Sequence, residues 1–235
     1  MKKAILLTIL SIIAISCNND DSSDNNEPQN PSENETTMKL KEFRGITTSK
    51  YYYHQNGFVD SISVIGGGMI QNNISKKFIY DSQKNLQTIE TIVKSYSNET
   101  IDHNISTYLY NNLNQIKTVI TQGVDNNAYI SMNYNYNSEG LLNSSGRTYS
   151  NENLIQEGNI TYTYDDKKNP YYEMYPLAYV RLNEINKNNT TSISNETETL
   201  VIINWTYNQK GYPVSFQKSP VIQDALNFAE YIYYL

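Results

Sequence analysis

The residues of this chain that could do chemistry are few. It has one cysteine, Cys17, and two histidines, His54 and His103, so a metal site built from several cysteines or histidines is excluded. No Gly-x-Ser-x-Gly nucleophile motif and no His-x-x-Glu-His metal motif is present. Carboxylates are common, but Asp81 and Asp165 fall where turns are expected. We therefore predict a protein that is not an enzyme, with no catalytic residue, no metal and no cofactor.

Three further residues are candidates for modification or ligand binding. Asp60-Ser61-Ile62 resembles the short Asp-Ser/Thr-apolar motif of bacterial O-glycosylation, although Ser61 could equally be an ordinary strand residue. Trp205 and Tyr207 could form a stacking platform for a sugar. We favour the alternative that both rings belong to the core, because Trp205 occupies a place that Tyr or Phe holds elsewhere in the chain.

The position of Trp205 belongs to a sequence pattern that recurs six times. The elements that this pattern predicts must position the candidate side chains. An aromatic residue is followed two positions later by a tyrosine, which puts both rings on one face of a strand. Asn, Asp or His comes next and favours a turn. Three positions later, glycine or asparagine suits a left-handed conformation, as at Gly140. The copies are Tyr51–Val59, Phe78–Leu86, Tyr108–Ile116, Tyr134–Leu142, Tyr162–Pro170 and Trp205–Pro213.

Each copy predicts a β-hairpin with a bulge after its turn. Lys84 and Lys168 replace the glycine in two copies, for which we expect loops one residue longer. Hairpins of this period stack on one another. The fold class is therefore all-β: an antiparallel β-meander of about six hairpin repeats, with one irregular or short helical insertion near 170–198. The insertion could carry function, or, as we favour, act as a lid over one end of the sheet.

The strands are expected to follow the hairpins. Ile130 and Met132 alternate with polar residues, which predicts a half-buried strand that runs on to Tyr136. Residues 154–164 are expected to form a single strand. Residues 187–194 are expected to form a polar loop, and residues 227–234 a closing strand.

The frame aromatic-x-Tyr-[Asn/Asp]-x-x-Gly-x-Leu resembles the YD repeats of Rhs-type and Tc-toxin proteins. It is more similar to a group of lipid-anchored surface proteins of the Bacteroidetes that have no assigned activity. These share segments like Lys168-Asn169-Pro170 and Asn188-Asn189-Thr190-Thr191. The resemblance covers about residues 40–235 and implies an array of hairpins. Because only six copies are present, with no toxin domain after them, a sealed shell around a cargo is not implied.

The N-terminus predicts export and anchoring. Residues 1–16 have the form of a signal peptide, with two lysines before an apolar run that is too short for a permanent membrane span. The run ends at Ile13-Ala14-Ile15-Ser16-Cys17, which resembles a lipobox and implies that Cys17 carries a lipid. The alternative is a secreted protein with a stray cysteine. Residues 17–37 predict a disordered tether, whose acidic start is either a surface-export signal or only a linker.

Charge and composition limit the partners. The formal net charge is −6; the signal peptide holds two lysines and the tether six acids, so the domain of residues 38–235 carries about −2. A near-neutral domain indicates no nucleic acid. We expect an outer-membrane protein that faces the cell exterior and contacts the membrane through Cys17. We expect it to be a non-catalytic binding or structural module whose partner is a glycan or a surface protein. The alternative is a glycan-binding or glycan-processing accessory of nutrient uptake.

Overall fold

The computed structural model describes residues 38–66, 72–95, 97, 99–125, 128–143, 146–220 and 226–234. Fifteen strands form one antiparallel sheet, in the order β8-β7-β6-β5-β4-β3-β2-β1-β15-β14-β13-β12-β11-β10-β9. The terminal strands β1 and β15 therefore pair in the middle of the sheet, and β8 and β9 are its edges. The prediction of an all-β antiparallel meander with one short helix is confirmed.

The strands in chain order are β1 (Leu40–Arg44), β2 (Thr48–Tyr53), β3 (Val59–Ile65), β4 (Asn73–Tyr80), β5 (Leu86–Lys94), β6 (Thr100–Tyr110), β7 (Ile116–Gly123), β8 (Tyr129–Asn133), β9 (Arg147–Ser150), β10 (Asn153–Glu157), β11 (Ile160–Lys168), β12 (Asn188–Ser194), β13 (Thr199–Tyr207), β14 (Pro213–Ser219) and β15 (Phe228–Tyr233). The helix is α1 (Leu177–Leu182). The predicted closing strand is confirmed as β15. The single strand expected over residues 154–164 is wrong, because a turn at Gly158, with φ +60°, separates β10 from β11. The polar loop expected over residues 187–194 is also wrong, because these residues form β12 between β11 and β13.

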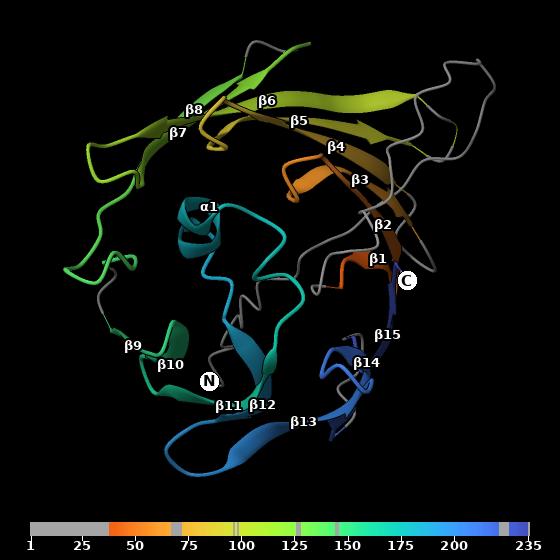
Figure 1. Cartoon of the computed structure of the whole chain (residues 1–235), viewed down its shortest axis with the longest axis vertical. Helices are drawn as coiled ribbons and strands as arrows, with labels where there is room; N and C mark the ends of the chain where they lie inside the picture. Colours follow the sequence, from red (N-terminus) through yellow and green to blue (C-terminus); the bar gives the residue numbers. More distant parts are fainter. Residues whose placement is uncertain are drawn as a thin grey trace, which may run out of the picture.

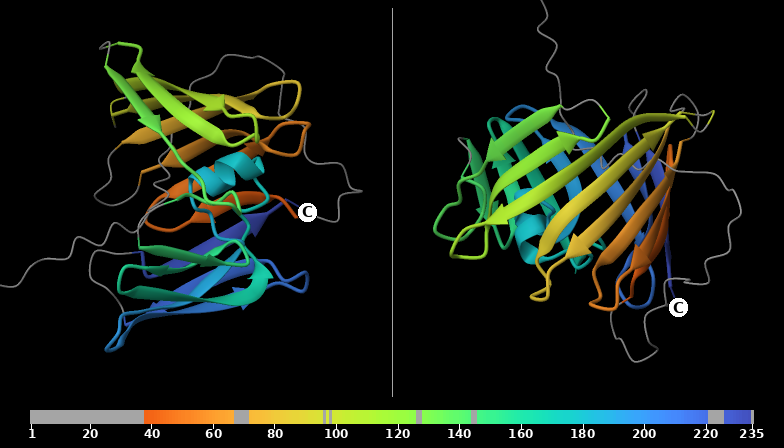
Figure 2. Two further views of the ribbon diagram at one scale, coloured as in Figure 1. Left: turned by 90° about the vertical axis from the view of Figure 1, so that its left-hand side faces the viewer. Right: turned by 90° about the horizontal axis from the view of Figure 1, so that it is seen from above.

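The sheet curves so that one face is concave, and α1 lies within the curve (Figure 1). Side views show the same arrangement, with the helix between the two halves of the sheet (Figure 2). Three rings of residues 170–182 pack against rings of the sheet: Tyr171 against Tyr51 at 6.2 Å, Tyr175 against Phe78 at 5.6 Å, and Tyr179 against Tyr108 at 5.8 Å between centroids. We call residues 170–182 the plug. Such buried rings dominate the energetics of a core, so the plug supplies the concave face with its main packing partner.

Four of the six predicted hairpins, the first, second, third and sixth, form with one hydrogen-bond pattern. In the first, the His54 N–H donates to the Phe58 carbonyl at 2.8 Å, and the Gly57 N–H donates to the His54 carbonyl at 2.9 Å. A register shift at Tyr53 confirms the bulge predicted after the turn. The side chain after the central tyrosine accepts the N–H two residues on, as predicted, and Asp81, Asn111 and Asn208 do so at 2.8–3.0 Å.

The longer loop expected at Lys84 is wrong. Lys84 itself adopts the left-handed conformation, with φ +67°. Its N–H donates to the Asp81 carbonyl at 3.0 Å, as the Gly57 N–H does to the His54 carbonyl. The backbone of this turn is therefore the same as in the glycine-containing copies, and the lysine carries the strain of that conformation.

The fourth hairpin forms its turn without a full second strand. Gly140 has φ +76°, as predicted, and its N–H donates to the Asn137 carbonyl at 3.0 Å. Beyond the turn, Tyr136 and Leu142 form only an isolated bridge. The strand predicted through Ile130 and Met132 forms as β8, but the half-burial predicted for it is wrong: the two residues are 53% and 52% exposed, because β8 ends the sheet.

The fifth hairpin is interrupted by the plug at its turn. β11 continues to Lys168, and the chain returns only at β12, where Thr190 lies opposite Tyr164. Asp165 accepts the N–H groups of Lys167 at 3.0 Å and Asn189 at 3.1 Å, as Asp81 accepts two N–H groups in the second hairpin. We expected a loop one residue longer at Lys168. This prediction is wrong, because the whole plug lies between the two strands of this hairpin.

The central tyrosines join successive hairpins. Three of their hydroxyls donate to the carbonyl that restarts a strand in the preceding hairpin: Tyr80 to Val59 at 2.6 Å, Tyr110 to Leu86 at 2.9 Å, and Tyr136 to Ile116 at 2.8 Å. These bonds satisfy carbonyl groups and hold neighbouring hairpins in register.

β15 and β1 reproduce a hairpin without a turn. Tyr233 lies opposite Leu40, as Tyr53 lies opposite Val59. The Tyr234 N–H donates to the Lys39 carbonyl at 2.9 Å, which matches the first bond of each turn. The two ends of the domain thus form one further hairpin that the chain divides between them.

Candidate functional site

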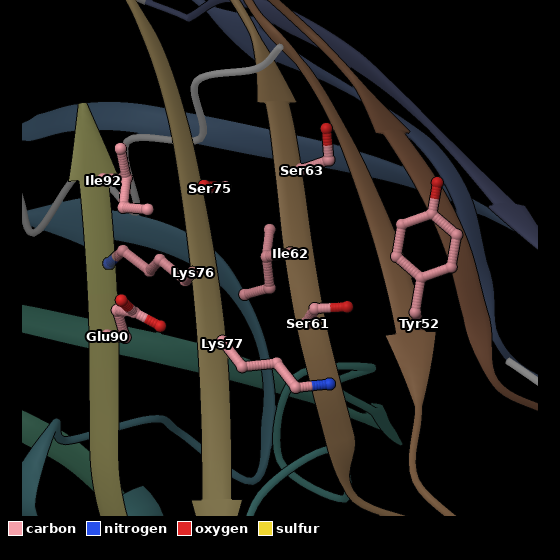
Figure 3. Close-up of a pocket in the computed structure, with 9 residues that line it drawn as sticks. All are labelled: Tyr52, Ser61, Ile62, Ser63, Ser75, Lys76, Lys77, Glu90 and Ile92. Atoms are coloured by element: carbon pink, nitrogen blue, oxygen red, sulfur yellow. The ribbon is translucent and has the colours of Figure 1, made fainter. Parts of the chain in front are cut away.

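A shallow groove of about 270 Å³ lies across β2, β3, β4 and β5 (Figure 3). Ile62 and Val64 of β3 are buried, so Ser61 and Ser63, which alternate with them, point to the outer face of the sheet. Ser75 of β4 lies opposite Ser63. These small side chains leave a hollow, because the residues that flank them are larger.

Register brings the groove residues together in two rows across the sheet. Side chains directly opposite each other in an antiparallel pair lie about 5 Å apart. The first row is Tyr52, Ser61, Lys77 and Glu90, and the second is Ser63, Ser75 and Ile92. One wall of the groove is therefore a tyrosine ring, and the other is the Glu90 and Ile92 side of β5.

One ion pair and one histidine–carboxylate hydrogen bond border the groove. The Lys77 ammonium group donates to both carboxylate oxygens of Asp60, at 2.7 and 2.6 Å. Ser61 Oγ donates to the same carboxylate at 3.1 Å. On β5 and β6, His103 Nε2 lies 2.8 Å from Glu90 Oε1. Both pairs are partly exposed, so they fix side-chain positions and contribute little to stability.

The groove places hydrogen-bond donors and acceptors beside one aromatic ring. The Ser61 hydroxyl donates to the Asp60 carboxylate, and no histidine is among the described residues that line the groove. Among the described residues, no group of three or more His, Cys, Asp or Glu could hold a metal ion. A flat ring, serine hydroxyls and charged donors and acceptors match a small ligand rich in hydroxyl groups.

Lys76 contributes its backbone to the groove and its side chain to the other face. It lies between Ser75 and Lys77 in β4, and Phe78 two residues on is buried in the core. Burial lowers the pKa of the Lys76 amine. Its charge is therefore directed to the concave side and does not help to hold a ligand in the groove.

The residues predicted for a site are not brought together. Ser61 lies in the groove. Trp205 lies on the concave face, where its ring is 5.0 Å from that of Phe216 and its Nε1–H donates to the Thr190 carbonyl at 2.7 Å. The Tyr207 hydroxyl donates to the Asp165 carboxylate. Both rings are thus engaged with the sheet, and Cys17 lies outside the described residues.

Tyr52, Lys77 and Glu90 were not predicted from the sequence as groove residues. Each occupies an outward position of a strand, where a polar or aromatic residue needs no special reason. Their proximity follows from the register between four hairpin-linked strands. The sequence signal that could have found them is the run of serines on the outward side of β3 and β4, which leaves the face hollow.

Within the part of the chain that the structure describes, no helix is long and apolar enough to cross a membrane.

Comparison with known proteins yields structural likenesses alone. No protein-family model and no curated protein matches the chain. A porin-like protein from Bacteroides uniformis is 14% identical, with 80% of this chain and 71% of that chain covered and a TM-score of 0.29. A porin-like protein from Bacteroides vulgatus is 13% identical, with 84% and 99% covered and a TM-score of 0.27. The Tc holotoxin pore of Photorhabdus luminescens is 12% identical, with 73% and 9% covered and a TM-score of 0.18. Likenesses this weak indicate nothing about function.

Proposed function

We propose that this chain is a lipid-anchored protein of the outer membrane that displays a non-catalytic binding module at the cell surface. The position of Cys17 directly after the apolar run supports the anchor, and the polar residues 18–37 support a tether. The chain enters the middle of the sheet through β1, so a tether there would leave the outer face accessible.

The groove on the outer face is the observation that carries the binding function. It combines the Tyr52 ring, the hydroxyls of Ser61, Ser63 and Ser75, and a charged group on Lys77. The opposite, concave face is filled by the plug. A ligand is therefore expected on the outer face, against backbone that β-sheet pairing holds rigid.

A glycan is the second candidate function, as ligand of the same groove. Sugars are bound by an aromatic ring that stacks on the apolar face of the pyranose and by polar groups that bond its hydroxyls. Tyr52 and the serine row supply both kinds of contact. O-glycosylation of Ser61 remains a prediction, and a sugar attached there would lie in the groove itself.

We further propose that the hairpins are copies of one YD-like unit, which makes this a surface lipoprotein of the kind that the Bacteroidetes resemblance implies. The shared turn bonds and the tyrosine hydroxyls that join Tyr80, Tyr110 and Tyr136 to the preceding hairpins support a common unit. The plug and the divided terminal hairpin would then be additions to this array.

The experiment that tests the binding function is a calorimetric titration of the purified protein with defined gluco-, manno- and galacto-oligosaccharides. Ser63→Trp fills the floor of the groove, and Tyr52→Ala removes its aromatic wall. We expect each to weaken binding at least about tenfold, near 1.4 kcal/mol. Phe228→Ala, an aromatic residue of β15 that is 48% exposed, is the matched control and should leave binding unchanged. Equal binding by all variants would exclude the groove.

A further inference from the structure

The edge strand β8 is unlike every other strand formed by the predicted hairpins. All five of its residues are exposed, and Tyr129, Ile130 and Met132 are 64%, 53% and 52% exposed. Its own hairpin returns only as far as the bridge at Leu142, so no second strand covers it in the described chain. An edge without a charge, a proline or a bulge is ready to pair with another strand.

The hydrogen bonds to β7 reveal which backbone groups of β8 point away from the sheet. The Tyr134 N–H donates to the Lys117 carbonyl at 2.8 Å, and the Ala128 carbonyl accepts the Gly123 N–H at 2.8 Å. Even-numbered residues therefore bond to β7, because backbone groups alternate in direction along a strand. The outward groups belong to the odd-numbered residues of β8, which are Tyr129, Ser131 and Asn133.

We propose that β8 pairs antiparallel with β8 of a second copy of this chain, around a two-fold axis at Ser131. In this register Ser131 lies opposite Ser131 of the partner subunit, and Tyr129 lies opposite Asn133 of the partner subunit. These opposed pairs consist of outward residues and form the hydrogen-bonded pairs of the antiparallel ladder, and non-hydrogen-bonded pairs lie between them. A two-fold interface of this kind is self-complementary by construction.

Charge favours a second copy over other occupants. Residues 126–138 hold no acid and no base, so two copies of β8 meet without burying a charge. The tether of residues 17–37 is a poorer occupant, because it would bring six acids and no base against this uncharged edge. The side chains also match: Ile130 lies opposite Met132 of the partner subunit, so pairing covers two apolar residues that are half exposed in the single chain.

The first test is the mass of the full-length chain in detergent, measured by sedimentation with the detergent contribution subtracted. We expect a dimer. Ser131→Pro removes one outward N–H and leaves the bonds to β7 intact, so the variant should sediment as a monomer. A wild type that stays monomeric at every concentration, or a dimer that survives Ser131→Pro, would overturn the proposal.

The second test fixes the register and does not depend on how well the proline variant folds. Opposed residues have Cα atoms about 5.5 Å apart, within the range of a disulfide. Mild oxidation should link Ser131→Cys to itself. Tyr129→Cys should not link to itself but should link to Asn133→Cys when the two are mixed. The unsubstituted chain measures any background from Cys17. Self-pairing in this register would be refuted if Tyr129→Cys links to itself or if no mixture links. It would also be refuted if a different protein occupies the β8 edge.

Discussion

Substitution of Gly140 by valine tests the turn of the fourth hairpin. Gly140 has φ +76°, a conformation that valine adopts only with strain. A Cβ atom here would also lie 2.6 Å from Arg181 Nη1 and 3.2 Å from Gln115 Nε2. The arginine tip must move, but it is the end of a flexible side chain. The backbone conformation therefore sets most of the cost, which we expect to be roughly 1–3 kcal/mol.

Asparagine at the same position separates backbone strain from the contact with Arg181. Both substitutions add a Cβ atom, but Asn tolerates the left-handed conformation, and Asn114 already adopts it with φ +58° in the third hairpin. Gly140→Asn should therefore cost at least about 1 kcal/mol less than Gly140→Val. The same pair at Gly57, where a Cβ atom would meet only Lys39 Nζ at 3.4 Å, should show the same difference.

The assay is urea unfolding of the soluble form that begins at Met38, with the free energy of unfolding extrapolated to water. Lys117→Ala, an exposed change outside any turn, is the control and should stay within about half a kcal/mol. Equal free energies for Val and Asn at position 140 would refute a left-handed turn there. They would also remove the physical basis for aligning the six hairpins.

Further predictions concern the anchor, the tether and the tyrosines. Cys17→Ser should abolish acyl labelling and release the protein from the membrane fraction; labelling that persists would exclude Cys17 as the anchor. Replacing Asp20, Asp21 and Asp24 with Ala should reduce digestion by protease added to intact cells; equal digestion would make these acids a plain linker. Burial raises the pKa of Tyr51 to about 12, against about 10 in the unfolded chain. The neutral phenol therefore contributes stability that is complete below pH 10 and lost as pH rises through the folded pKa near 12. Tyr51→Phe should flatten this alkaline loss by up to about 3 kcal/mol in urea unfolding; an unchanged slope would contradict the burial of the phenol.

The local parts of the fold were predictable because local chemistry determines them. Asn137 and Gly140 specify the fourth turn, in which Gly140 has φ +76° as predicted. The prediction of the fifth hairpin was wrong for a reason that is not local. The Asp165 carboxylate accepts backbone N–H groups as in the other turns, but one of them belongs to Asn189, which lies beyond the plug. The insertion near 170–198 was predicted, but no local pattern at Lys168 shows that it lies within the fifth turn.

The candidate site was predictable only at Ser61. Tyr52, Lys77 and Glu90 become neighbours through the pairing of four strands, and a shift of one residue in any strand would send them to the other face. The exposure of β8 was missed for a related reason. Its alternating residues predict a half-buried strand, but its place in the sheet makes it an edge.

The measurement that tests the central claim most directly is a map of backbone amide shifts while an oligosaccharide that binds is titrated into the isotope-labelled protein. The account predicts that shifts cluster on β2, β3, β4 and β5, at Tyr52, Ser61, Ser63 and Ser75 and the residues beside them. Ser63→Trp should abolish them without changing the rest of the spectrum. Shifts that cluster around the plug or Trp205 would contradict a binding groove on the outer face, and no shift with any sugar of the panel would exclude a glycan as its ligand.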